Sequence, residues 1–134
     1  MNTGSPSRRT SVAIVDDDAS VRVGLQRLCK VLGLDVTSYA SGHDFLVSLL
    51  DGASPSDCLL IDAHMPEMNG MELRQHLLAA GIDIPTILFS GDDGPLLAAQ
   101  SFGSGVVAYL RKPLGGDELL EAIERAVAGR ARTR

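Results

Sequence analysis

A short, continuous apolar run, Cys58-Leu59-Leu60-Ile61, stops abruptly at a single carboxylate, Asp62. A run of this kind, bounded by turn residues, predicts a strand that is buried on both faces, as parallel sheets require. Asp62 would then stand at the carboxyl end of that strand, and ligand crevices in open α/β sheets lie outside such ends. The alternative is that Asp62 merely begins the turn that Pro66 and Gly70 complete. The rest of the chain has to decide between the two.

The remainder of the chain alternates between short apolar runs and segments with helical spacing. The apolar runs predict five strands, at 11–15, 34–40, 57–62, 84–89 and 106–110. The intervening and final segments predict helices at about 21–32, 41–50 and 70–80, from the loop at 90–95 to about 102, and at about 117–128. Strands that alternate with helices predict an α/β fold with a parallel sheet and helices on both faces, because the crossovers are right-handed.

Periodicity does not give the order of the strands. In the flavodoxin-like order, 2-1-3-4-5, the point where the chain switches direction falls between the first and third strands. Asp16 and Asp62 are the residues at those two carboxyl ends. This coincidence favours a functional site there over a simple turn.

Length and charge limit the classes of function. With 134 residues the chain predicts one domain, and its net charge of -5 gives no electrostatic basis for binding nucleic acid. No apolar stretch approaches the roughly 18 residues of a membrane helix, and no signal peptide is evident, so we expect a cytoplasmic protein. Cys29 and Cys58 lie in apolar surroundings and predict small buried side chains rather than a disulfide or a metal site.

The two ends of the chain differ in composition from the middle. Residues 1–10 are rich in Ser, Thr, Pro, Gly and Arg and predict a disordered tail, because they offer little to bury. Residues 11–129 would form the domain. Residues 130–134 carry Arg130, Arg132 and Arg134 and predict a basic tail or the start of a linker.

Three carboxylates, those of Asp16, Asp17 and Asp62, would meet at the switch point. Like charges at close range repel unless a cation neutralises them. An all-oxygen ligand set without a thiolate or imidazole suits a hard ion, and Mg²⁺ fits best when water and a phosphoryl group complete the coordination. The alternative for the acidic run is that Asp17 or Asp18 only caps the first helix.

Two further polar residues stand at strand ends on the same edge of the sheet. Lys112 follows the fifth strand and would supply a positive charge for a bound anion, although a lone lysine is usually a solvated surface residue. Ser90 follows the fourth strand and would either donate a hydrogen bond to a phosphoryl oxygen or be an ordinary turn residue.

Four motifs now carry a family resemblance, and they occur in the right order between about residues 12 and 127. They are Asp16-Asp17 after Val12-Ala13-Ile14-Val15, the segment Asp62-Ala63-His64-Met65-Pro66-Glu67-Met68-Asn69-Gly70, then Ser90-Gly91, and Tyr109-Leu110-Arg111-Lys112-Pro113. Together they resemble the receiver domain of two-component response regulators, and within that family the FixJ-like subgroup. No single motif is decisive, but the combination is specific.

The resemblance implies a role for each residue at the acidic edge. Asp62 matches the aspartate that accepts a phosphoryl group from the phosphohistidine of a sensor histidine kinase. Asp16 and Asp17 match the acidic pair that holds Mg²⁺, and His64 matches the residue whose backbone carbonyl completes the protein ligands of the metal. The resemblance also implies a phosphoprotein that switches state and is not itself an enzyme.

The remaining matches concern the response to phosphorylation. Ser90 matches the Ser/Thr that binds the phosphoryl group, Lys112 the lysine that pairs with it, and Tyr109 the aromatic switch residue, which could also be a plain edge aromatic. The bond Lys112-Pro113 matches one that is commonly cis in the family. The fourth helix, fifth strand and fifth helix would form the output surface. This surface would support homodimerisation, and it would regulate transcription through a domain or partner outside this chain.

Some positions depart from the commoner patterns of the family. The side chain of His64 lies two residues beyond Asp62 and could affect dephosphorylation, although most lone histidines are structural or solvated. Asp92 and Asp93 add negative charge just after Ser90, which would tune the lifetime of the phosphoryl group or only keep the loop solvated.

Two rival functions follow from the same residues. A haloacid dehalogenase-like phosphatase also uses a strand-end aspartate with a second acid two residues on, as Asp16 and Asp18 could, but there the lysine precedes the late acidic pair, whereas Lys112 follows Asp92-Asp93. The other rival is a receiver-like docking module that no longer takes phosphate. The intact acidic residues, serine and lysine argue against this alternative.

Overall fold

The computed structural model describes residues 9–65, 67–91 and 106–132, which contain five strands and four helices. They are β1 (Ser11–Val15), α1 (Ala19–Val31), β2 (Asp35–Tyr39), α2 (Gly42–Leu50), β3 (Cys58–Asp62), α3 (Gly70–Ala79), β4 (Thr86–Ser90), β5 (Ala108–Arg111) and α5 (Gly116–Arg132). The predicted helix that ends near residue 102 and most of the predicted N-terminal tail lie outside the described residues.

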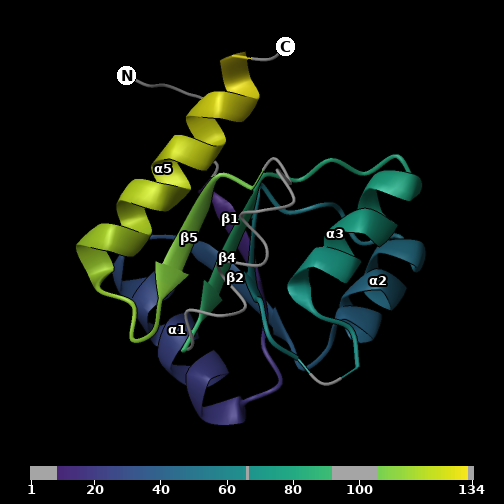
Figure 1. Ribbon diagram of the computed structural model, residues 1–134. Helices are drawn as coiled ribbons and strands as arrows, with labels where there is room; N and C mark the ends of the chain where they lie inside the picture. The colour runs from purple at the N-terminus through teal and green to yellow at the C-terminus, as the bar shows by residue number, and fades with distance from the viewer. Residues whose placement is uncertain (1–8, 66, 92–105, 133–134) are drawn as a thin grey trace.

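The five strands form one parallel sheet in the order β2-β1-β3-β4-β5, which confirms the flavodoxin-like prediction (Figure 1). Strands β3 and β4 are buried along their whole length, as their continuous apolar sequences predict. In the register of the sheet, Val15 pairs with Ile61, and Asp62 pairs with Phe89. The carboxyl ends of β1, β3 and β4 therefore lie side by side at one edge of the sheet.

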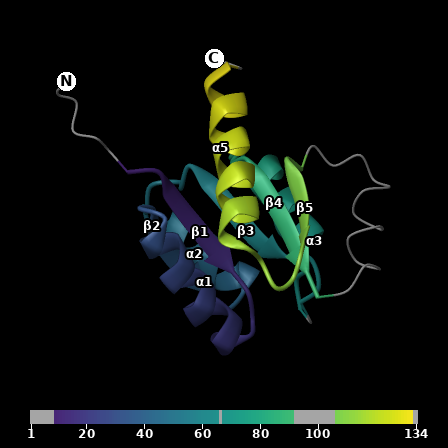
Figure 2. The same ribbon diagram turned by 90° about the vertical axis from the view of Figure 1, so that its left-hand side faces the viewer.

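Helices cover both faces of the sheet. Helices α1 and α5 lie on one face and α2 and α3 on the other (Figures 1 and 2). The first pair packs against alternate strand residues such as Ile14, Leu60 and Phe89, and the second against residues such as Leu59 and Leu88. Because neighbouring residues of a strand point to opposite faces, each buried strand contributes to both cores. No helix in the described ranges has both the length and the apolar character needed to cross a membrane.

Side-chain caps fix where the helices begin. The carboxylate of Asp18 accepts hydrogen bonds from the first turn of α1, and the hydroxyl of Ser41 accepts one from the Asp44 amide of α2. Helix α3 begins with a complete capping box, in which Asn69 and Glu72 each bond the other's backbone amide, a feature that the sequence reasoning did not single out.

Several boundaries differ from the predicted ones. Strand β4 begins at Thr86 rather than at residue 84, because Pro85 has no amide to donate and the Ile84 carbonyl is taken by side chains. Strand β5 begins at Ala108, two residues later than predicted. Helix α5 continues to Arg132, past the predicted end at residue 128, because Gly129 is a weak helix former but does not end the helix, and the three residues after it are strong helix formers.

Candidate functional site

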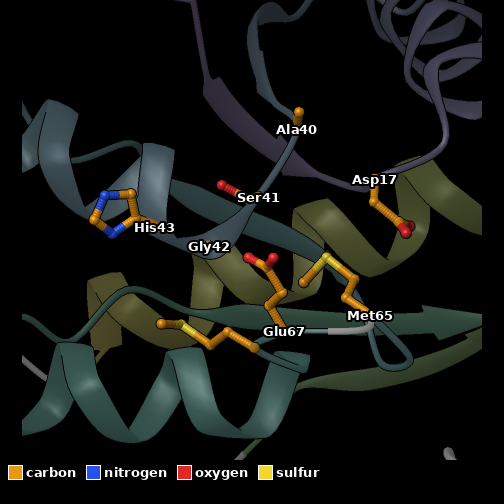
Figure 3. A pocket seen from close by; sticks show the side chains of 8 residues that line it. Asp17, Ala40, Ser41, Gly42, His43, Met65 and Glu67 are labelled. Carbon is orange, nitrogen blue, oxygen red and sulfur yellow. The ribbon is translucent and has the colours of Figure 1, made fainter.

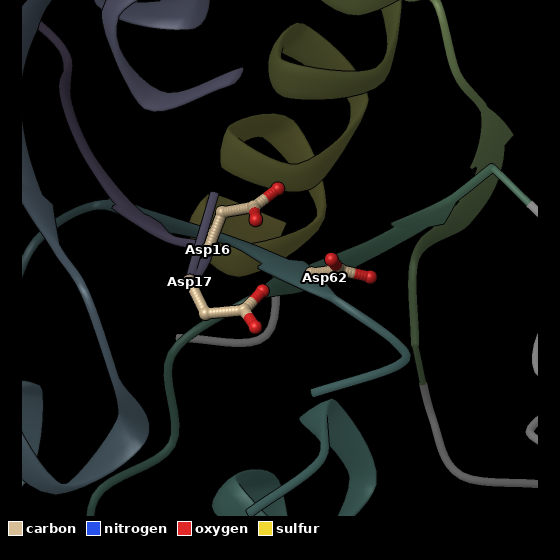
Figure 4. A group of neighbouring side chains, drawn as sticks. All are labelled: Asp16, Asp17 and Asp62. Atoms are coloured by element: carbon tan, nitrogen blue, oxygen red, sulfur yellow. The ribbon is translucent and has the colours of Figure 1, made fainter. Parts of the chain in front are cut away.

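Three carboxylates converge at the carboxyl edge of the sheet (Figure 4). Asp16 and Asp17 follow β1, and Asp62 is the last residue of β3, the strand beside β1. One carboxylate oxygen from each of the three lies within 4.8 Å of the others. Asp16 and Asp62 are buried, whereas Asp17 is exposed, so the cluster is open to solvent at Asp17. The parallel pairing of β1 with β3 brings together the residues that the sequence predicted would meet.

Lys112 reaches this cluster from the end of β5. Its Nζ atom lies 3.0 Å from Oδ2 of Asp16 and 3.1 Å from Oδ2 of Asp62. The same Nζ lies 5.0 Å from the centre of the Phe89 ring, and the Lys112 amide donates a 2.9 Å hydrogen bond to the Ser90 carbonyl. The Lys112–Pro113 peptide bond is cis. Lys112 is therefore an ordered part of the site rather than a solvated surface residue.

Burial and charge shape the protonation of the site. Burial raises the pKa of Asp16 above its ordinary value, although the Asp18 amide and the Lys112 ammonium oppose that effect. Burial alone would lower the pKa of Lys112, but its hydrogen bonds and charge interactions with Asp16 and Asp62 outweigh this effect and raise it. Lys112 therefore stays charged, and one ammonium faces three carboxylates.

The residues fit a hard divalent cation. The Asp18 amide donates to Oδ1 of Asp16 at 2.8 Å, and the His64 amide donates to Oδ1 of Asp62 at 2.9 Å. Oδ2 of Asp16 is buried and accepts no hydrogen bond of good geometry, although the Lys112 ammonium is close to it. The single charge of Lys112 does not balance the three carboxylates, so a further cation would be favourable here. An oxygen-only set of this kind matches the ligands that Mg²⁺ prefers.

The acidic run after β1 divides into two kinds of residue. Oδ1 of Asp18 accepts hydrogen bonds from the amides of Ser20 at 2.9 Å and Val21 at 3.3 Å, so Asp18 is the cap of α1. Asp17 makes no such cap and belongs to the carboxylate cluster. This resolves the alternative that the sequence left open for the two residues.

A cavity of about 490 Å³ adjoins the exposed side of the cluster (Figure 3). It lies between the start of α2 and the loop after β3, and Asp17 lines it together with Met65, Met68 and Glu67. Asp17 is therefore approachable from this side. The sequence reasoning did not anticipate the cavity, because it depends on how two loops far apart in the chain pack together.

Ser90 and Tyr109 lie on neighbouring strands. Ser90 is buried at the end of β4, and Tyr109 is half-buried in β5, where it pairs with Leu88 and packs against the core that α2 and α3 cover. Strand alternation places Ser90 on the same face as Leu88, two residues before it. The two residues thus belong to one face of the sheet, and Asp62 pairs with Phe89, the residue before Ser90.

The residues that depart from the commoner family patterns are only partly described. The His64 side chain is exposed, and its backbone amide holds Asp62 as noted above. Asp92 and Asp93 lie outside the described residues. Cys29 and Cys58 are both buried and free, and burial raises the pKa of Cys29 to about 11 and that of Cys58 to about 12, which leaves both thiols unreactive.

With this geometry established, we compared the chain with known proteins. The family model described as the response regulator receiver domain matches residues 12–124. The chain belongs to the response regulator receiver family. This assignment favours the receiver over the phosphatase alternative and agrees with the positions of the strand-end carboxylates.

Individual relatives place the chain near the FixJ-like subgroup. It is 32% identical over 128 residues to the transcriptional regulatory protein TdiR of Thauera aromatica, covering 96% of this chain and 56% of TdiR. It is 34% identical over 120 residues to the response regulator protein TodT of Pseudomonas putida, covering 90% of this chain and 52% of TodT. The crystal structure of FixJ-N superposes with a TM-score of 0.78 and 32% identity, covering 90% of this chain and 95% of FixJ-N.

The chain spans about half the length of these first two relatives. Receiver domains are generally signalling modules that histidine kinases phosphorylate, rather than enzymes, and relatives of this one are named as transcriptional regulators. The chain therefore belongs to the two-component signalling class.

Proposed function

We propose that this chain is a phosphoacceptor receiver, and that Asp62 accepts a phosphoryl group from the phosphohistidine of a sensor histidine kinase. The observation that carries the proposal is the convergence of Asp16, Asp17 and Asp62 with the ammonium of Lys112 at one edge of the sheet. A carboxylate nucleophile beside fixed positive charge is what phosphoryl transfer requires, because the protein contributes mainly position and electrostatics.

In the proposed reaction, a carboxylate oxygen of Asp62 attacks phosphorus in line with the leaving imidazole. The P–O bond to Asp62 forms as the P–N bond breaks, and the imidazole nitrogen of the kinase leaves with the electron pair. Mg²⁺, held by Asp16, Asp17, Asp62 and the backbone carbonyl of His64, would supply positive charge to the phosphoryl oxygens. Lys112 pairs with another phosphoryl oxygen, and the His64 amide keeps the Asp62 carboxylate oriented.

The acyl phosphate would act on the switch residues through charge. Ser90 bonds a phosphoryl oxygen and moves toward Asp62, which leaves room for Tyr109 to turn inward on the same face of the sheet. Such a pair is a two-state element that a local change of charge biases. The surface formed by β5, α5 and the predicted helix that ends near residue 102 is then the output face.

This proposal extends to the partners. The output face would support a phosphorylation-dependent homodimer. It would also control transcription through a domain or partner outside this chain, as the name of the transcriptional regulatory protein TdiR suggests. We expect the domain to act in the cytoplasm, away from membranes, and not to bind DNA directly, because its net charge is -5.

The proposal is tested by incubating the protein with acetyl phosphate and Mg²⁺ and recording its intact mass. We expect one phosphoryl addition that requires Mg²⁺ and disappears in Asp62→Asn. No addition to the folded parent protein would favour the docking module instead. Addition that survives Asp62→Asn but fails in Asp16→Asn would place the nucleophile on β1 and contradict the proposal.

The residues near the acceptor also have a proposed effect on lifetime. The exposed imidazole of His64 is two residues from Asp62, where it would assist or obstruct the water that hydrolyses the acyl phosphate. Asp92 would act on the same step through its charge. Equal acyl-phosphate lifetimes in His64→Ala and the parent would remove the role of the imidazole, and the same comparison with Asp92→Asn tests the carboxylate.

A further inference from the structure

Arg22 makes a contact with the acidic loop that the proposed reaction does not use. It lies in the first part of α1, half-buried, and its Nη1 atom donates a 2.7 Å hydrogen bond to the backbone carbonyl of Asp16. That carbonyl belongs to the peptide unit that joins Asp16 to Asp17. The bond is short and charge-assisted, which makes it one of the stronger kinds of hydrogen bond.

The other polar groups around this loop are held by different partners. The Asp16 amide donates to the Tyr39 carbonyl of β2 at 3.2 Å, and the Asp18 amide donates to Oδ1 of Asp16. The Asp18 carboxylate caps α1. The loop is thus anchored before and after Asp17, and Arg22 holds the carbonyl of the peptide that directly precedes it.

We infer that Arg22 is a positioning residue for the metal site: it fixes the Asp16–Asp17 peptide so that the carboxylate of Asp17 meets those of Asp16 and Asp62. Asp17 is the exposed member of the cluster, so little packing holds its side chain in place. The direction of its Cα–Cβ bond depends on the orientation of the peptide before it. A partner that fixes this orientation acts on the metal as other supporting hydrogen bonds do.

This inference rests on the proposed Mg²⁺ site. It predicts that removing Arg22 lowers the affinity for Mg²⁺, whereas simple electrostatics predicts that it raises this affinity. Arg22 is a cation close to a cation site, so removing its charge should tighten Mg²⁺ binding if charge were its main effect. If Arg22 positions Asp17, removing it should weaken Mg²⁺ binding. The two effects oppose each other, and the direction of the change distinguishes them.

The test measures the dissociation constant of Mg²⁺ alone by isothermal titration calorimetry, in the absence of any phosphoryl donor. Arg22→Met keeps an apolar stem but removes the donor and the charge, and Arg22→Lys restores a charged donor. Arg27→Met is the matched control, since Arg27 is an exposed residue of the same helix and its loss changes the net charge equally. The free energy of unfolding without Mg²⁺ is recorded for each variant.

We expect Arg22→Met to weaken Mg²⁺ binding about tenfold, as loss of a supporting hydrogen bond does at other metal sites. Arg22→Lys should recover most of the affinity, and Arg27→Met should match the parent. Arg22→Gln, a milder change whose shorter amide falls short of the carbonyl, should weaken binding in the same direction if Arg22→Met does not fold.

Unchanged or tighter binding in the folded Arg22 variants would overturn the inference, and a loss of unfolding free energy without a change in affinity would show a purely structural role. If the parent protein itself does not bind Mg²⁺, the proposed metal site is wrong and the inference falls with it. The two failures are therefore distinguishable from the first titration.

Discussion

Among the described residues, a carboxylate cluster and an arginine of α3 hold charge in opposite ways. The carboxylate cluster of Asp16, Asp17 and Asp62 occupies the carboxyl edge of the sheet, with Lys112 as its cation. The guanidinium of Arg74, on α3, lies against the opposite end of β4. Both groups carry the cost of removing charge from water, but only the second resembles a finished structural contact.

Arg74 joins α3 to the segment that leads into β4. Its Nη1 atom donates to the Ile84 carbonyl at 3.3 Å and to the Thr86 hydroxyl at 3.1 Å, and Nη2 lies 3.8 Å from the Asp83 carboxylate. Thr86 in turn donates to the Ile84 carbonyl at 2.9 Å. Each partner here is supplied by the chain itself, so this group requires no ligand.

The carboxylate cluster differs in that its charges do not balance. One ammonium faces three carboxylates, and Oδ2 of Asp16 is buried without a well-formed hydrogen bond. A fold that only needed stability would not keep such an arrangement, since pairing or apolar replacement would be less costly. The two groups therefore differ in charge balance: the chain supplies the partners of Arg74, whereas the cluster has more carboxylates than ammonium groups, as the proposed cation site requires.

The largest expected effect is on the affinity for Mg²⁺. Replacing Asp17 with Asn should weaken Mg²⁺ binding roughly 100-fold, about 2.7 kcal/mol, because a charged oxygen ligand is lost. The measurement is the rise in unfolding temperature on adding Mg²⁺, which should shrink in Asp17→Asn. The exposed Glu121 of α5 provides the control, as Glu121→Gln should keep the full rise. Equal shifts in the two variants would contradict a metal site at Asp17.

The second effect belongs to the structural group. Arg74→Met should lower the free energy of unfolding by about 2 kcal/mol, since it removes hydrogen bonds to a buried cation. Its Mg²⁺ affinity should stay at the parent value, because the two groups lie at opposite edges. Urea unfolding and Mg²⁺ titration of the same variant check both statements. A change in Mg²⁺ affinity would break the separation between the two groups.

Replacing Lys112 should have a smaller effect on Mg²⁺ binding than replacing Asp17, and in the opposite direction. Its ammonium competes with a metal for Asp16 and Asp62, so Lys112→Met should tighten Mg²⁺ binding about tenfold, or 1.4 kcal/mol. Calorimetric titration of Lys112→Met against Lys30→Met, a change at an exposed lysine of α1, isolates the local effect from that of net charge. Weaker binding in Lys112→Met would mean that Lys112 helps to build the metal site instead.

The smallest expected effect is on the pH dependence of the free energy of unfolding in the absence of metal. The pKa of Asp16 is raised in the folded state by burial, so the native protein binds this proton more tightly than the unfolded chain. Its contribution to stability is therefore present below the ordinary carboxyl pKa and is lost as the pH rises through the raised value. Unfolding in EDTA as the pH rises above the ordinary carboxyl pKa should show this loss in the parent but not in Asp16→Asn. Parallel curves would contradict it.

The sequence predicted the carboxylate cluster because its members stand at strand ends. Once a parallel sheet is expected, the residues that end neighbouring strands must meet at one edge, as Asp16 and Asp62 do at the ends of β1 and β3. Lys112 follows β5, which β4 separates from β3, and reaches the two carboxylates through its long side chain. The strand order needed one hypothesis beyond periodicity, the flavodoxin-like order, and the sheet confirms it.

The contacts that depend on side-chain reach could not be predicted in the same way. The hydrogen bonds of Arg22 and Arg74 join residues 6 to 12 positions apart across a turn or loop, where helix and strand periodicity carry no information. The start of β4 was misplaced because Ile84 is apolar and buried like a strand residue, while the adjacent Pro85 cannot donate to the sheet. An apolar sequence pattern indicates which residues are buried, but it does not show which of them form backbone hydrogen bonds in the sheet.

The most direct test of the central claim is to locate the phosphoryl group in the chain. After treatment with acetyl phosphate and Mg²⁺, borohydride reduces an aspartyl phosphate to homoserine, and peptide mass spectrometry then identifies the modified position. We predict homoserine at residue 62 only when acetyl phosphate and Mg²⁺ were both present before reduction, with residues 16 and 17 unchanged. Homoserine at residue 16 or 17, or none anywhere in a folded protein, would contradict the assignment of Asp62 as the acceptor.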